Sequence, residues 1–200
     1  MKLLVLVLCL FIGGCASSPP ENPGNICAIF KQHRHWYKAA IATRDKWGAP
    51  VHIPMAIMKQ ESSFRHDAAP PMRFFLWIIP IGRVSDAYGY SQAREVAWEE
   101  YVNETGNWFA DRDDFSDAMD FIGWYIDKTH RINKISKWDA YSQYLNYHEG
   151  RAGYRRKSYR TKPWLLKVAR KVDRQAKAYS KQFWGCKQEL ADEGWFPLLY

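Results

Sequence analysis

The chain has 200 residues, enough for one domain of ordinary size with a single core, and one compact domain is the expectation. It carries 29 Lys and Arg against 21 Asp and Glu, a net charge of +8, which favours an anionic polymer, a membrane surface or nucleic acid as partner. Ten Trp and twelve Tyr are compatible with sugar binding, although most such rings fill cores.

The N-terminus resembles a secretory leader. Residues 3–12 are almost wholly apolar and follow Lys2, and the run is too short to span a bilayer comfortably. Gly13 and Gly14 stand directly before Cys15, as in the processing box of bacterial lipoproteins. We therefore expect residues 1–14 to be a lipoprotein signal peptide and Cys15 to carry lipid. An uncleaved anchor, or a plain signal peptide cut elsewhere, is the alternative.

The residues after Cys15 predict how the domain is attached. Ala16, in place of Asp, favours sorting to the periplasmic face of the outer membrane if the organism is Gram-negative. Residues 15–24 are small, polar and rich in proline, which predicts a lipidated tether, with the domain itself over residues 25–200. Export also disfavours nucleic acid as a partner, and we expect a monomer.

Cleavage and lipidation would leave Cys27 and Cys186 as the remaining cysteines, one near each end of the domain. In an oxidising compartment, two such cysteines predict a disulfide that ties the first helix to the last. Two unrelated buried thiols are the alternative.

The apolar periodicity of the domain predicts a mainly α fold with irregular loops. Strand signals are scarce and no internal repeat is present. The expected helices are residues 26–47, a helix with Pro54 in its first turn that ends after Glu61, and residues 91–105, 115–132, 136–148 and 163–184.

Residues 70–82 are strongly apolar but are bounded and broken by prolines, so they cannot form a regular helix throughout. They predict either a loop or short hairpin that packs on the core, or a lid or membrane-facing patch beside the active site.

Three segments carry residues suited to chemistry. Residues 58–64, Met-Lys-Gln-Glu-Ser-Ser-Phe, close a short helix, so that Glu61 can point off its end into a cleft. Residues 87–92, Ala-Tyr-Gly-Tyr-Ser-Gln, open a later helix, and residues 146–150, Asn-Tyr-His-Glu-Gly, close another. A lone Glu on a helix is usually a solvated surface residue, and only the three segments together are informative.

In this order and spacing, the three segments resemble the lysozyme-like domain of lytic transglycosylases, the group that includes the soluble lytic transglycosylases and goose-type lysozymes. The resemblance covers about residues 50–155 and implies a lysozyme-like helical domain that binds peptidoglycan strands without a cofactor. It makes Glu61 the catalytic acid and base. The substrate-binding residues that it implies are Ser62, Ser63, Gly89, Tyr90, Gln92, Tyr147 and His148.

The match is uneven across the motifs. Gly89 and Gln92 agree with the family's Gly-Leu-Met-Gln motif, whereas Tyr90 and Ser91 differ. Only Tyr147 and Gly150 agree with the Ala-Tyr-Asn-Ala-Gly motif, and the resemblance implies that Tyr147 holds the Glu61 carboxyl group by a hydrogen bond. The long gap before Gly89, caused by the apolar insertion, marks a divergent branch.

Most glycosidases use two carboxylates, and only one is clear here. A single Glu with a raised pKa can protonate the leaving oxygen and then, as a base, deprotonate the C6 hydroxyl of N-acetylmuramic acid, giving a 1,6-anhydro sugar. A second carboxylate, Asp86 or Glu149, would instead indicate a hydrolytic muramidase, although Asp86 more simply caps or braces its loop. The third possibility is an idle lipoprotein that binds peptidoglycan without cutting it.

Two weaker patterns complete the sequence. His33 and His35 lie two positions apart and so face different sides of a helix, which favours solvated polar residues over a metal site. Residues 151–162 interleave Arg and Lys with Tyr and form either a solvated loop or a basic surface that grips peptide carboxylates of the wall or anionic lipid.

Overall fold

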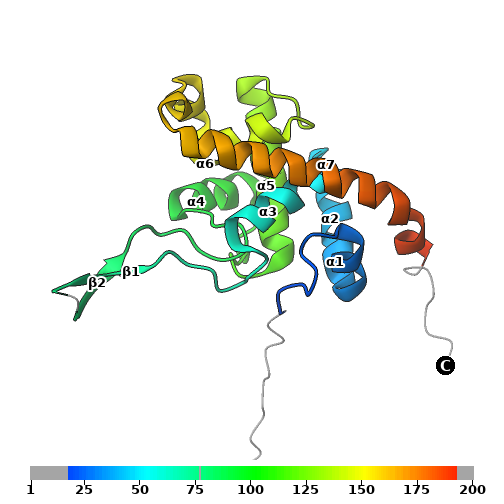
Figure 1. Ribbon diagram of the computed structural model, residues 1–200, viewed down its shortest axis with the longest axis horizontal. Coiled ribbons are helices and arrows are strands. Elements are labelled where there is room, and N and C mark those ends of the chain that lie inside the picture. Colours follow the sequence, from blue (N-terminus) through cyan, green and yellow to red (C-terminus); the bar gives the residue numbers. More distant parts are fainter. Residues whose placement is uncertain (1–17, 77, 193–200) are drawn as a thin grey trace, which may run out of the picture.

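The structure is a computed structural model that describes residues 18–76 and 78–192. It confirms a mainly α, lysozyme-like architecture with little sheet (Figure 1). The helices are α1 (Ile26–Gln32), α2 (Arg34–Trp47), α3 (His52–Ser62), α4 (Glu95–Thr105), α5 (Phe115–Asn133), α6 (Ala140–Arg155), a 3-10 turn η1 (Ser158–Thr161) and α7 (Pro163–Asp192); the strands are β1 (Met72–Phe75) and β2 (Ile79–Arg83).

Local signals in the sequence set most helix ends. Asn25, Asp114 and Asp139 accept hydrogen bonds from the first backbone N–H groups of α1, α5 and α6. Gly48 and Gly106 end α2 and α4 in the left-handed conformation, which glycine adopts without steric cost.

The core is built around α5, which is buried over most of its length and packs against α2, α3, α4 and α6. Stacked and edge-to-face rings fill it, including Trp36 on Phe115 at 4.1 Å between ring centroids. The long helix α7 crosses both α3 and α6, as Figure 1 shows, so the helix that carries Glu61 and the helix that carries Tyr147 share one support.

Four of the expected helices have different boundaries in the structure. Residues 26–47 form two helices, because the chain leaves the helical conformation at His33, whose ring stacks on Trp36. The helix expected from residue 91 begins at Glu95. The helix expected at residues 136–148 is α6, which begins at Ala140, kinks at Gly150 and continues to Arg155. Gly185 does not end α7, because Cys186 and Leu190 beyond it are buried and hold the helix on the core.

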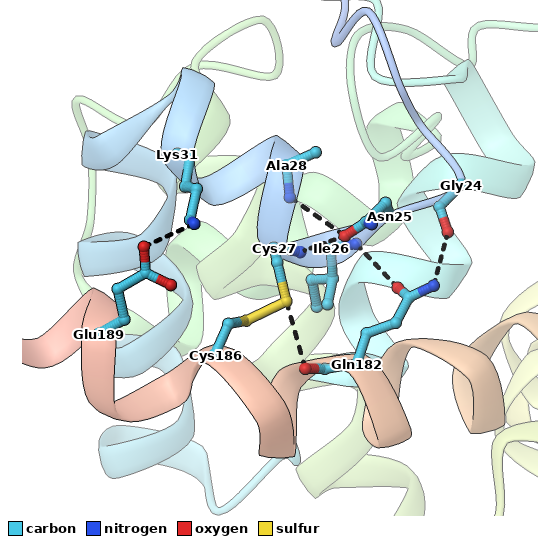
Figure 2. The surroundings of a disulfide bond; sticks show 9 residues. All are labelled: Gly24, Asn25, Ile26, Cys27, Ala28, Lys31, Gln182, Cys186 and Glu189. Carbon is cyan, nitrogen blue, oxygen red and sulfur yellow. Dashed lines mark hydrogen bonds and ion pairs between the residues drawn. A yellow bond between two sulfur atoms is a disulfide. The ribbon is translucent and has the colours of Figure 1, made fainter.

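A disulfide between Cys27 and Cys186 ties α1 to α7, as expected, with Cα atoms 6.1 Å apart (Figure 2). The side chain of Gln182 lies beside it, accepting from the backbone N–H of Ile26 and donating to the carbonyl of Gly24. An ion pair of 2.6 Å between Lys31 and Glu189 lies on the same contact.

The structure describes part of the predicted tether. The leader and Cys15 lie outside the described residues, but residues 20–24 are held against the domain. Pro20 is buried, the Glu21 N–H donates to the side chain of Gln32, and the Tyr179 hydroxyl donates to the carbonyl of Pro23. Composition alone suggested a free linker over this stretch, but these backbone groups find partners on α1 and α7.

The apolar segment is a two-stranded antiparallel hairpin that projects from the helical body (Figure 1). The expected short hairpin is present, but the alternative in which it packs on the core is contradicted, since its described side chains are exposed on both strands. Among the described residues, no helix is both long and apolar enough to cross a membrane.

Candidate active site

A cleft of about 850 Å³ brings the three sequence motifs together. Its walls come from the end of α3, the turn before α4 and the first half of α4, three residues of α5, and α6 from Tyr147 onward. The side chains that matter most for chemistry are Glu61, Gln92, Glu100, Tyr125, Tyr147, His148, Glu149, Arg151, Arg155 and Arg156.

A second, smaller hollow of about 270 Å³ adjoins the first. Glu61 and Gln92 line both hollows, and Ser62, Ser63 and Arg65 line only the smaller one. Glu61 therefore lies between the two hollows. A group that acts on a bond within a polymer needs space for the chain on both sides of that bond.

The backbone after Glu61 turns sharply. Ser63 and Phe64 both have positive φ angles, 53° and 62°, an uncommon conformation for non-glycine residues. The buried ring of Phe64 draws the chain back into the core and ends α3 directly after the glutamate. Glu61 thus lies in the last turn of a helix that is anchored in the core by its buried residues 53–58.

The environment of Glu61 suits a group that must carry a proton. Burial raises the pKa of its carboxyl group to about 7, and a hydrogen bond from the Tyr144 hydroxyl opposes part of this rise. Near neutral pH both protonation states are therefore accessible, which a group needs in order to serve as acid and then as base.

The two serines beside Glu61 have different surroundings. The Ser62 hydroxyl is buried and donates to the carbonyl of Met58, within its own helix. The exposed Ser63 hydroxyl makes a 3.4 Å contact with the carbonyl of Lys59. Both residues border the smaller hollow, and their binding of substrate stays a prediction.

Gln92 and Gly89 shape the opposite wall. The Gln92 side-chain nitrogen donates to the carbonyls of Ala68 and Gly89, at 2.7 and 3.0 Å, so its amide plane is fixed. Gly89 has a φ of 72°, and a Cβ there would lie 1.9 Å from the carbonyl oxygen of Arg112, a position that only glycine can occupy without a shift of the backbone.

Tyr90 was expected to bind substrate and does not face the cleft. It is 1% exposed and packs edge-on against Trp36 and Phe115 in the core. The turn that presents Gln92 directs the Tyr90 side chain inward. The aromatic residue in the Gly-Tyr-Ser-Gln segment therefore packs in the core and does not contact the cleft.

Tyr147 lines the cleft but does not play the expected role. Its hydroxyl donates to the carbonyl of Ser91 at 2.6 Å, which links α6 to the turn before α4. The tyrosine that holds the Glu61 carboxyl group is Tyr144, one helical turn earlier. Sequence reasoning missed Tyr144, although its three-residue spacing from Tyr147 places both on one face of the helix.

His148 lies in the cleft with its ring edge-on to Trp164, at 5.2 Å between centroids, and its Nδ1 is 3.0 Å from a Glu149 carboxylate oxygen. Glu149 is also paired with Lys162 at 2.7 Å. Burial alone would raise the pKa of Glu149, but hydrogen bonds from Lys162, Ser158 and His148 lower it to about 2. Glu149 is therefore held as an anion.

The other acidic groups near the cleft are also paired. Glu100 contacts Arg151 at 2.5 Å and Lys128 at 2.7 Å, and these cations keep its pKa low despite its burial. Asp86 pairs with Arg94 and accepts from the N–H of Glu95, so it braces the start of α4 as expected. Of the acidic residues that line the described cleft, Glu61 is the one without a cationic partner.

Within residues 18–76 and 78–192 we find no group of three or more metal-binding side chains. His33, expected to be solvated, is 8% exposed and stacks on Trp36.

A helical domain with one glutamate of raised pKa between two hollows is typical of lysozyme-like domains that cleave glycans. The chain belongs to the transglycosylase SLT domain family, whose family model matches residues 3–186. No curated protein matches the chain. No solved structure matches it either.

Proposed function

We propose that the protein is a peptidoglycan lytic transglycosylase that cleaves the β-1,4 bond between N-acetylmuramic acid and N-acetylglucosamine and forms 1,6-anhydro-N-acetylmuramic acid. Membership of the family supports the reaction class. The observation that carries the proposal is the state of Glu61: burial raises its pKa to about 7, and the other acids that line the described cleft are paired with cations.

The reaction needs one carboxyl group. Protonated Glu61 gives its proton to the glycosidic oxygen as the bond from C1 breaks, and the acetamido carbonyl of the muramic acid ring supports the charge at C1. The Glu61 carboxylate then takes the proton from the C6 hydroxyl, whose oxygen bonds to C1. Glu61 ends protonated, and no water is consumed.

A hydrolytic muramidase is the second enzymatic candidate, and it needs a group that activates water or stabilises the cation. Glu149 is the nearest candidate by sequence, but its oxygens are occupied by Lys162, Ser158 and His148. This pairing favours the lyase. A catalytically idle binding protein is disfavoured by the raised pKa of Glu61, since a binding surface gains nothing from a buried acid without a cationic partner.

We further propose that the protein acts from the periplasmic face of an outer membrane, anchored as a monomer by lipid on Cys15. The leader-like sequence of residues 1–14 and the disulfide between Cys27 and Cys186 support export to an oxidising compartment. Its partner would be the glycan strand, bound by Gln92, Tyr147, His148 and the two serines after Glu61.

The products released from purified sacculi test the reaction. We expect muropeptides with anhydro ends, which mass spectrometry finds lighter by one water than reducing ends; reducing ends alone would establish a hydrolase. Glu61→Gln should abolish release while sacculus binding persists. Glu99→Gln, an exposed glutamate on α4 outside the cleft, is the matched control and should release muropeptides at the parent rate.

A further inference from the structure

The hairpin of β1 and β2 is the largest feature that the cleft chemistry leaves unexplained. Its described apolar side chains are all exposed, with Leu76 at 68% and Ile78 at 80% at the tip. Contiguous exposed apolar surface of this kind costs free energy in water and marks an interaction site. The question is what covers it.

The register of the strands places apolar groups on both faces. Phe74 pairs with Pro80 on one face, and Ile79, the neighbour of Pro80 on β2, lies on the other face. Phe74 and Ile79 are about equally exposed, at 53% and 54%. A protein groove covers one face of a ribbon, whereas a lipid phase surrounds the tip on all sides.

The edges of the hairpin disfavour pairing with another strand. Pro80 has no backbone N–H to donate, and the register shifts between Arg73 and Phe74. Proline and bulges are devices by which sheet edges avoid strand addition. A second copy of the chain, or a peptide that adds a strand, is therefore a poor fit.

The charges at the base complete the pattern. Arg73 and Arg83 flank the apolar tip on opposite faces, and residues 68–85 include no Asp or Glu. The tip beyond the arginines extends about three residues, roughly 10 Å at the rise of a strand, the depth at which interfacial segments sit in a bilayer. The arginines then lie at the level of the lipid phosphates.

We propose that the hairpin inserts its tip into the headgroup region of an anionic lipid bilayer. In Figure 1 the hairpin and the first described residues, drawn in dark blue, both lie in the lower half of the view. Because residues 20–24 are fixed to the domain, only four residues separate Cys15 from Pro20. This last point rests on the proposed lipidation; the insertion itself does not.

Insertion would also orient the enzyme. Ser85 and Ala87, directly after β2, line the cleft, so the hairpin joins the membrane contact to the wall of the active site. The cleft would lie a fixed, short distance above the bilayer.

Vesicle flotation tests the proposal with a chain that begins at Ala16. This chain keeps every described residue, including the core and the disulfide, and lacks the leader and Cys15, so a failure of lipidation cannot affect the result. We expect it to float with vesicles that contain phosphatidylglycerol and much less with pure phosphatidylcholine. Leu76→Asn with Ile78→Asn should weaken binding on the order of tenfold.

The variants are chosen to keep the fold. Leu76 has a φ of 49°, which asparagine tolerates, and both side chains are exposed. Phe109→Asn is the control, because Phe109 is 98% exposed on a different loop, and it should bind like the parent. Arg73→Glu should remove the preference for anionic vesicles. No flotation, equal flotation of the Asn pair, or self-association that the Asn pair abolishes would overturn the proposal.

Discussion

The Tyr147 hydroxyl donates a 2.6 Å hydrogen bond to the backbone carbonyl oxygen of Ser91. This bond joins the third sequence motif to the second and holds the turn that presents Gln92. Tyr144, one turn earlier on α6, is bonded to Glu61 instead. Two tyrosines on one helix face thus have separate tasks, one structural and one electrostatic.

This division predicts different effects of removing each hydroxyl. Burial raises the pKa of Glu61 and the Tyr144 hydrogen bond lowers it, so Tyr144→Phe should raise that pKa further and move the alkaline limb of the pH–rate profile upward. Tyr147→Phe should leave the limb in place and lower stability by about 1 kcal/mol. Profiles of muropeptide release measure both, and identical shifts in the two variants would contradict the assignment.

Glu61 also makes stability depend on pH. Its folded pKa, about 7, lies above the ordinary value of 4.5, so its contribution is fully present below pH 4.5 and is lost as pH rises through 7. Above these pH values the parent must keep a charged carboxylate buried, which lowers its free energy of unfolding, and Glu61→Gln removes this cost. The free energy of unfolding of Glu61→Gln, relative to that of the parent, should therefore rise between pH 5 and 8 by on the order of 2–3 kcal/mol at most. Urea unfolding at both pH values measures this; a constant difference would count against a buried carboxyl.

Gly89 and Gly106 form a matched pair, with φ angles of 72° and 70°. Alanine at Gly106 meets no atom within 4 Å and should cost only the backbone strain, about 1–2 kcal/mol. Alanine at Gly89 meets the Arg112 carbonyl and should cost roughly 1–3 kcal/mol more. Urea unfolding of the two variants measures the difference. Equal losses in the free energy of unfolding would show that the close approach of Gly89 to the Arg112 carbonyl is unimportant.

Arg155 and Arg156 line the cleft, are exposed and have no ion-pair partner among the described residues. If they contact the carboxylates of wall peptides, Arg155→Ala with Arg156→Ala should weaken sacculus binding several-fold, and the loss should shrink at high salt. Glu61→Gln chains allow binding to be measured without turnover. Lys157 is an exposed neighbour outside the cleft, and Lys157→Ala should bind sacculi like the parent. An equal loss of binding in this variant would indicate that the overall positive charge, and not the two arginines, binds the wall.

The disulfide closes most of the domain, because its cysteines are separated by 159 positions in the sequence. Replacing Cys27 and Cys186 by Ala should lower stability by about 4–5 kcal/mol in the chain-entropy model. Reductant should destabilise the parent similarly and leave the double variant unchanged, as calorimetry would show.

The sequence predicted the helical class, because apolar periodicity is a local signal, as along residues 163–184. It also predicted the disulfide and the approach of Tyr147 to the cleft. The predictions failed where packing between elements that are distant in the sequence determines the local structure. No Gly or Pro marks the break at His33, whose ring stacks on Trp36. The burial of Tyr90 and the pairing of Tyr144 with Glu61 likewise depend on the docking of separate helices.

The buried stripe of α7, which includes Leu165, Val172 and Tyr179, supplies no side chain to the described lining of the cleft, yet α7 braces both α3 and α6. The packing of α7 against α3 and α6 therefore determines the distance of Glu61 from Tyr144 and Tyr147. A random mutagenesis screen for lost activity should consequently return positions along this stripe, far from any sugar, and their defects should be relieved by substitutions that repack the helix rather than by changes in the cleft.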